Sequence, residues 1–436
     1  MGNWVSIAII AVETVVIFFL LKRWLRRWWR RAKQDWKDRR PRRWKPKSPE
    51  DCELCCAGMS ACRVANRDVV PYSSVKSRRG RKKTVSTAGY ACPNPDCTYC
   101  GITDETRHAL VGYGIQSGAQ RLKCQACGKV FTSRFGTPLY YLKTESHQVE
   151  FALLFLAEGV DASVLVRYTG HSDATLARWL QRMGQHSVGW HNYLFRELTL
   201  TFIQMDEMYS RVRRQASAIW LWLAIDSQTK VIPAMHIGGR TKTDAFALVH
   251  DLKSRLAPDC VPVFTTDGLR SYFYAVTAHF GYWSRPKRAR KDHWFVSPDL
   301  LYGQLVKRKD RGKKRFALTR MLWGERRMFR ETLRSLGLTS TIQTAFVERV
   351  NLTFRQGVSA LSRRTWAYAQ SVESLTYHVE WFRLYYHLVR PHESLRVELN
   401  GSRRRYKQRT PAMAAGVTKE IWEIRRLLHY PVPVSA

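Results

Sequence analysis

The first long apolar stretch of the chain runs from Trp4 to Leu21, and Glu13 is its one charged residue. As a helix, these residues span about 27 Å, close to the thickness of a bilayer's hydrocarbon core. Lys22–Arg31 follows and is rich in Trp and Arg, as on the cytoplasmic side of a membrane span. Residues 1–31 therefore predict a hydrophobic helix with a basic flank that anchors the chain in a membrane. The alternatives are a helix that packs on the protein, or a translated leader that is not kept.

Helical periodicity dominates residues 145–190. Ser172 is a suitable N-cap, and the apolar residues after it recur at helical spacing: Leu176, Trp179, Leu180 and Met183. The polar residues Thr175, Arg178 and Arg182 point elsewhere. Short helices followed by a polar-faced helix are typical of a helix-turn-helix domain, whose last helix enters the major groove of DNA. A plain helical bundle is the alternative.

The period changes to that of strands at residue 198. We expect a strand that ends at Asp206, two more over 218–225 and 231–237, a helix over 245–256 and a strand that ends at Asp267. This order predicts an α/β fold, a mixed sheet with flanking helices, over residues 198–396. Residues 284–340 are basic and look like an insertion, and Glu348 lies on a later helix over 345–361. Residues 397–436 form a basic C-terminal tail.

Charge adds a partner to this outline. The chain has 73 Lys and Arg against 35 Asp and Glu, a net charge of +38, and Trp and Tyr are interleaved with the basic clusters. Such a chain is attracted to a polyanion, and its aromatic rings can stack on bases. The composition therefore favours binding to nucleic acid over an ordinary solvated surface.

The cysteines indicate a metal site rather than disulfides. Nine of the ten lie before residue 130, and Cys-x-x-Cys pairs in a long chain are typical of zinc knuckles. Residues 89–142 predict a zinc ribbon, for which we favour the ligands Cys92, Cys97, Cys124 and Cys127, with Cys100 as a substitute in the first knuckle. Unrelated buried thiols are the alternative. Residues 32–88 are interpreted as a basic linker. Its Cys52–Cys62 cluster is a candidate for a second metal site.

Carboxylates supply the candidate chemistry. Asp206 and Asp267 each follow a predicted strand, and ends of strands are where α/β layers build sites. Together with Glu348 they can hold two Mg²⁺ ions, which relieve their repulsion and promote in-line displacement at phosphorus. Three further acids are the competing candidates for this site, although ordinary structural roles would also explain them: Glu207, Asp226 and Asp244.

Four stretches carry a family resemblance: MDEMYS around Asp206, TTDGL around Asp267, TAFVERVNLTFRQGVSALSRRT around Glu348, and YYHLVRPHESLR from residue 385. Over roughly residues 90–415 the chain resembles bacterial insertion-sequence DDE transposases with a zinc ribbon and a helix-turn-helix. The resemblance implies a ribonuclease-H-like catalytic domain, binding to terminal inverted repeats, and strand transfer dependent on Mg²⁺ (or Mn²⁺). It also implies metal ligation by the three acids, and roles in support or DNA contact for Arg349, Asn351, Arg390 and His392. The hydrophobic N-terminus departs from the family pattern.

We therefore expect a DNA transposase that acts as a homo-oligomer on element ends and target DNA. We expect the protein to be cytoplasmic or associated with the nucleoid. If the N-terminal helix spans the membrane, the protein is tethered to its cytoplasmic face. The alternatives are a catalytically inactive DNA-binding regulator and a membrane-anchored nuclease of the same fold.

Overall fold

The computed structural model describes residues 47, 72 and 85–433, apart from residues 117, 214–217, 288–289, 310–314 and 400–404. The predicted hydrophobic helix over 4–21, the Cys52–Cys62 cluster and nearly all of the linker lie outside the described residues. Within the described part of the chain, no helix combines the length and the apolar character that crossing a membrane requires.

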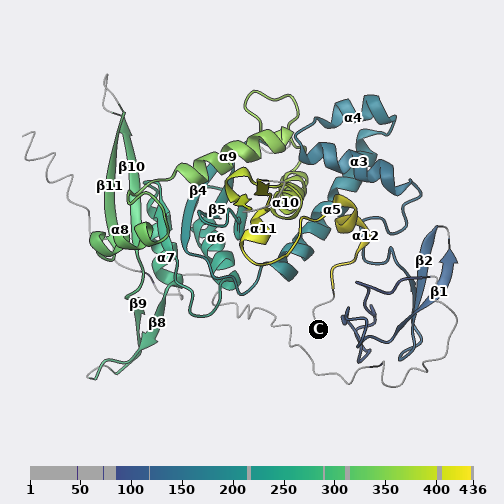
Figure 1. Ribbon diagram of the computed structural model, residues 1–436. Coiled ribbons are helices and arrows are strands. Elements are labelled where there is room, and N and C mark those ends of the chain that lie inside the picture. Colours follow the sequence, from purple (N-terminus) through teal and green to yellow (C-terminus); the bar gives the residue numbers. More distant parts are fainter. Residues whose placement is uncertain are drawn as a thin grey trace, which may run out of the picture. The chain divides into compact units, whose positions relative to one another are not determined.

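A small antiparallel sheet (Figure 1) shares a buried core with four of the described cysteines. Its strands pair in the order β1 (Leu110–Gln116), β2 (Ala119–Cys124) and β3 (Val130–Thr132). Leu110 and Leu122 are buried with four cysteines in the core of this module. Such a small core buries little apolar surface, so a module of this size usually needs a metal or another staple.

Three helices follow, as the apolar pattern predicted: α3 (Ser146–Ala157), α4 (Ala162–Thr169) and α5 (Asp173–Leu194). The Ser172 hydroxyl accepts a hydrogen bond from the backbone N–H of Thr175, which confirms the expected N-cap of α5. Gly170 ends α4 in the left-handed region at φ 72°, where glycine is favoured. The apolar stripe of α5 is buried, with Trp179 and Met183 almost fully enclosed.

These helices pack against α10 (Val372–Leu388), which comes almost 200 residues later in the chain. The Trp381 indole donates to the carbonyl of Leu153 at 2.8 Å. Gly184 permits close contact, because a Cβ there would lie 2.4 Å from the Cβ of Tyr377. The helical segment therefore shares its packing with the C-terminal half of the chain.

The largest element is a mixed six-stranded sheet in the order β11-β10-β7-β4-β5-β6. Its central strands β4, β7 and β10 are parallel, whereas β5, β6 and β11 pair antiparallel with their neighbours. The bounds are β4 (Phe202–Ser210), β5 (Ile219–Asp226), β6 (Ala234–Gly238), β7 (Val263–Thr266), β10 (Tyr302–Lys309) and β11 (Arg315–Trp323).

Helices cover both faces of this sheet. On one face Leu221 and Leu223 of β5 share a buried cluster with residues of α9 (Ala345–Gly357) and α10. On the other face lie α6 (Lys242–Arg255) and α7 (Arg270–His279), and Trp222 packs edge-on against Tyr272 at 5.4 Å. The expected α/β class, a mixed sheet with flanking helices, is thus confirmed.

Two expectations about this region need correction. The strand expected to end at Asp206 continues to Ser210, because Asp206 pairs with Leu223 in the interior of the β4–β5 ladder. Residues 284–340, expected as an insertion, contain β10 and β11 of the main sheet. Both strands lie toward one edge of the sheet and carry clustered basic side chains. These side chains interrupt the apolar alternation by which a strand is recognised in a sequence.

The remaining elements are short or peripheral. A hairpin of β8 (Gly281–Ser284) and β9 (His293–Val296) follows α7. Helix α8 (Arg326–Ser335) packs near β10 and β11, at one edge of the main sheet. The C-terminal part folds onto the protein and buries Trp422 and Leu427. Its elements are η4 (Glu393–Leu395), β12 (Val397–Glu398), β13 (Tyr406–Lys407), α11 (Pro411–Ala414) and α12 (Ile424–His429), and η3 (Ser359–Leu361) follows α9.

Candidate metal centres

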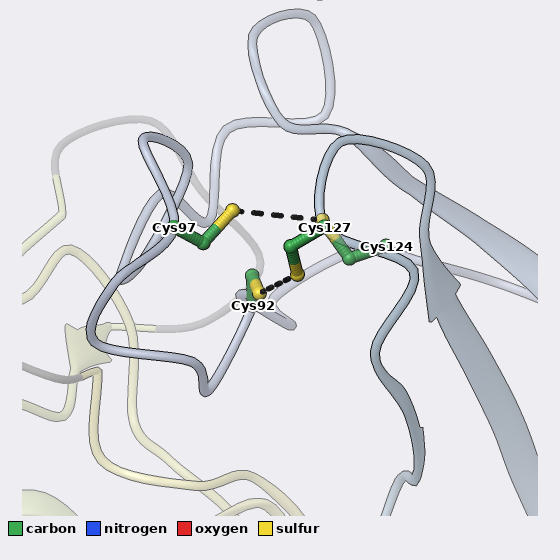
Figure 2. Close-up of side chains that lie close together, drawn as sticks. All are labelled: Cys92, Cys97, Cys124 and Cys127. Carbon is green, nitrogen blue, oxygen red and sulfur yellow. Dashed lines mark hydrogen bonds between the residues drawn. The ribbon is translucent and has the colours of Figure 1, made fainter.

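Four cysteine thiols converge in the small sheet, with Cys92 and Cys97 facing Cys124 and Cys127 (Figure 2). The sulfur of Cys92 lies 3.6 Å from that of Cys127, and that of Cys97 lies 3.8 Å from that of Cys124. A tetrahedral zinc site with bonds of about 2.3 Å places its sulfurs about 3.8 Å apart. The spacing of the thiols therefore fits a single tetrahedral ion.

The four grouped thiols are the set that the sequence favoured, and Cys100 is buried beside them but does not belong to the group. Burial raises the pKa of Cys97 to about 11, whereas backbone and Asn94 hydrogen bonds bring the pKa of Cys127 to about 7 against the effect of burial. One thiol is thus prepared to be a thiolate, the form that ligates metals. A positive φ of 74° at Gly128 lets the chain turn tightly after the second pair.

A second candidate centre lies on the large sheet. Carboxylate oxygens of Asp206, Glu207 and Asp267 all lie within 4.8 Å of one another. Asp267 directly follows β7, as expected, and the pairing of Met205 with Thr266 places it beside Asp206. The two predicted aspartates therefore lie close together. Their group also contains a third acid, Glu207, which the sequence analysis treated as a structural competitor.

Crowding of these acids changes their protonation. Burial, with the charges of Glu207, Asp267 and Glu348, raises the pKa of Asp206 to about 7. Burial also raises the pKa of Asp267, although Arg240 and Lys307 oppose the change. Because neighbouring carboxylates disfavour each other's ionisation, a divalent cation bound among them is stabilised by their negative charges.

Glu348 lies in the first turn of α9 near these acids but is not one of the tight group. Its carboxylate accepts hydrogen bonds from Lys307 on β10 and from Thr344 at 2.6 Å. Partial burial acts to raise the pKa of Glu348, but these two hydrogen bonds outweigh it and hold the pKa below its ordinary value. Because its charge still raises the pKa of Asp206, Glu348 is within electrostatic reach of the site.

Two amide side chains fix the geometry between β4 and α9. The Gln204 side-chain oxygen accepts hydrogen bonds from the backbone N–H groups of Phe346 and Val347, which begin α9. Asn351, one turn further along, donates to Asp206 at 2.8 Å. Asn351 therefore supports an acid, one of its two expected roles, whereas Gln204 had no recognisable signal in the sequence.

The Glu207 carboxylate belongs to the acid group but is already paired with other side chains. Arg240 forms an ion pair with it, and the Tyr272 hydroxyl donates to it at 3.1 Å. The other two competitors are structural, as expected. Asp226 accepts backbone hydrogen bonds from Thr201 and Phe202, and Asp244 forms the capping box of α6.

A cationic group surrounds the start of α9. Burial, followed by the charges of Lys230, Arg349 and Arg390, lowers the pKa of His392 to about 4. The structure thus brings together three residues that the resemblance implied, and adds Lys230. Lys230 is buried at a positive φ of 62°, and its ammonium lies 3.9 Å from the Phe346 ring centroid.

The three polar residues expected to read DNA differ in their surroundings on α5. Arg178 is exposed, whereas Thr175 takes part in the N-cap through a 3.0 Å contact with Ser172. Arg182 donates to the carbonyls of Pro138 and Tyr140. Arg182 therefore joins α5 to the segment that precedes it, and Arg178 is the exposed residue of the three.

No protein-family model matches the chain, and no curated protein sequence matches it either.

Proposed function

We propose that this protein is a DNA transposase, which binds the terminal inverted repeats of its element and cleaves and joins DNA with divalent metal ions. The observation that carries the proposal is the convergence of Asp206 and Asp267, with Glu348 nearby, at the centre of a mixed sheet. This is the ligand set that the resemblance implies, on a sheet consistent with its ribonuclease-H-like domain.

The donor set fits Mg²⁺ or Mn²⁺ better than a softer ion. It consists of carboxylate oxygens without His or Cys, and the raised pKa of Asp206 reflects negative charge that a divalent cation would balance. When bound there, divalent cations supply activation of a water or 3′-hydroxyl and stabilisation of the leaving oxygen.

The chain's own residues hold this site in shape. Asn351 orients Asp206, and Gln204 fixes the start of the helix that carries Glu348. Lys307 neutralises Glu348 in the absence of metal. Because Lys307 is exposed on a long flexible side chain, it can turn from Glu348 to a DNA phosphate when the substrate arrives.

The other modules are assigned on the same basis. We propose that the four-cysteine module over 89–142 is a zinc ribbon and that residues 145–190 read the element ends, with Arg178 as a contact. Arg349 and Arg390 of the cationic group supply phosphate contacts beside Glu348, whereas Lys230 is buried behind them. The net charge of +38 supports DNA as the partner, and two element ends call for a homo-oligomer.

The decisive experiment uses the full-length protein and labelled DNA that carries the sequences flanking its gene. We expect cleavage and joining with Mg²⁺, none with EDTA, and a loss of at least about a hundredfold in Asp206→Asn and Asp267→Asn. Asp259→Asn, which changes an exposed aspartate, is the matched control and should retain activity. Unchanged chemistry in Asp267→Asn would refute the metal-site assignment.

The same assay separates the alternatives. End binding without metal-dependent chemistry under any condition indicates a DNA-binding regulator of this architecture. Cleavage without end specificity indicates a nuclease, and fractionating cells that express full-length and residue-30-truncated chains then tests the membrane tether. Equal solubility of the two forms would remove the tether.

A further inference from the structure

The hairpin of β8 and β9 exposes aromatic rings that the proposed chemistry does not use. Tyr282 pairs with Phe295 across the hairpin, and their rings lie nearly parallel, with centroids 6.0 Å apart and planes 25° apart. Their side chains are 51% and 39% exposed, respectively, far more than a folding role requires. His293, on the same face by strand alternation, is exposed as well.

The opposite face of the hairpin explains why these rings point outward. The Trp294 indole donates to the Thr277 carbonyl on α7 at 2.8 Å. Trp294 also lies over Gly281, where a Cβ would come within 2.8 Å of its ring. The hairpin, which follows α7 (Figure 1), is thus fixed to this helix through Trp294. Strand alternation places Tyr282 and Phe295 on the other, free face.

The loop that joins the two strands is strongly basic. Its described residues include four exposed cations and a single acid, Asp292, which is paired with Arg285 at 2.9 Å. The cations are Arg285, Lys287, Arg290 and Lys291. Adjacent aromatic rings and unbalanced cations suit a nucleic-acid strand, whose bases stack on rings while its phosphates meet the cations.

We propose that the free face of the β8–β9 hairpin is a stacking platform for unpaired bases of the DNA substrate, with Tyr282 and Phe295 as the rings that bases contact. Unpaired bases are favoured over duplex, because the faces of bases in a duplex are covered by their neighbours. This inference rests on the proposed function for the identity of the strand as DNA.

The platform is separate from the acids. Helix α7, which links Asp267 to the hairpin, has ten residues and is about 15 Å long. Tyr282 and Phe295 contribute nothing to the acid group, so their loss should leave metal binding at the acids unchanged.

The test measures binding of the full-length protein to a fluorescent 20-nucleotide single strand and to the matched duplex, without added Mg²⁺ at fixed salt. Tyr282→Ala/Phe295→Ala should weaken single-strand binding by about tenfold or more and duplex binding by less than about threefold. The exchanged variant Tyr282→Phe/Phe295→Tyr keeps both rings and should bind as wild type. Trp366→Ala, at an aromatic residue that is 95% exposed, is the matched control.

Three results would overturn the platform: unchanged single-strand affinity, an equal loss for single strand and duplex, or an altered oligomeric state that marks the rings as a contact between protein copies. Circular dichroism and thermal unfolding of each variant exclude a folding defect. Failure of the proposed function is distinguishable, because it is read from metal-dependent cleavage by Asp267→Asn and not from binding without Mg²⁺.

Discussion

The side-chain oxygen of Gln204 accepts a hydrogen bond from the backbone N–H of Val347 at 3.1 Å, and so joins β4 to the first turn of α9. Gln204 lies two residues before Asp206, and Val347 directly precedes Glu348. This contact, made between residues 143 positions apart, sets how closely two candidate metal ligands approach each other.

Replacing Gln204 with Ala should therefore loosen the site as well as the fold. It leaves two N–H groups at the start of α9 without their acceptor, which costs about 1–3 kcal/mol in the free energy of unfolding. Urea unfolding measures this loss, and Mg²⁺-dependent cleavage should fall with it. Gln408→Ala, at an exposed residue just after β13, is the control and should change neither quantity.

Replacing Asp206 with Asn should stabilise the metal-free protein at pH 8. The folded-state pKa is about 7 against an ordinary value of 3.8, so the unfolded chain releases this proton first. Stability is lost as the pH rises from about 4 to 7. At about 1.4 kcal/mol per pH unit, the ionised carboxylate costs up to roughly 4 kcal/mol above pH 7.

Thermal unfolding without added Mg²⁺ at pH 8 tests this expectation, and Asp206→Asn should unfold at a higher temperature than wild type. Added Mg²⁺ should reduce or reverse the difference, because only the wild type gains a complete ligand set. An Asn variant that is less stable than wild type without Mg²⁺ at pH 8 contradicts the electrostatic account of the site.

Replacing Lys307 with Gln should tighten Mn²⁺ binding in the absence of DNA. The ammonium competes with the metal for Glu348, but the pair is about half exposed, and such pairs contribute roughly 0.2–1 kcal/mol. We expect an increase in affinity of up to about fivefold by calorimetric titration. Lys287→Gln, in the β8–β9 loop, removes the same charge at a distance and should leave the affinity unchanged.

Replacing Cys97 with Ser should remove one metal ion per chain, whereas Cys100→Ser should not. The sulfur of Cys97 lies 3.8 Å from that of Cys124, and Cys100 is outside the four-thiol group. Elemental analysis of the purified proteins measures the difference in zinc content. Equal zinc in the Cys97 variant and wild type would rule out the assigned set, and loss in the Cys100 variant would point to the substitute ligand.

On α5, Arg178 and Arg182 should respond differently to replacement by Ala. Arg178 is exposed, so its loss should weaken duplex binding and reduce the salt dependence by about one phosphate contact. Arg182 bonds two backbone carbonyls, so its loss should mainly lower the unfolding temperature. Similar DNA affinities for Arg178→Ala and wild type would remove the proposed contact.

The sequence predicted elements with a clean period and residues fixed by local chemistry. The apolar stripe of α5, its Ser172 cap and the position of Asp267 after β7 depend on neighbours within a few residues. The sequence also favoured the four thiols that group together, although it left Cys100 as a substitute in the first knuckle. The binding of zinc, Mg²⁺ and DNA remains a prediction, because residue spacing and packing show the ligand atoms and not the partner that they bind.

What the sequence could not predict depends on contacts across the fold. Glu207 and Asp206 are adjacent, and nothing local indicates that one meets Arg240 while the other meets Asn351. The strands β10 and β11 were hidden by their charge, since a basic edge hairpin lacks the apolar alternation of a buried strand. Lys230 gains its cationic neighbours only when α9 and the segment after α10 fold beside it.

The packing of α3 and α5 against α10 has a consequence for synthesis on the ribosome. At about 5–20 residues per second, the segment that supplies Trp381 for Leu153 is made on the order of ten to fifty seconds after α3. During that interval the early helices lack their partner, and Glu348 is translated only near its end. A nascent chain that has not yet reached Glu348 therefore cannot bring this carboxylate to Asp206.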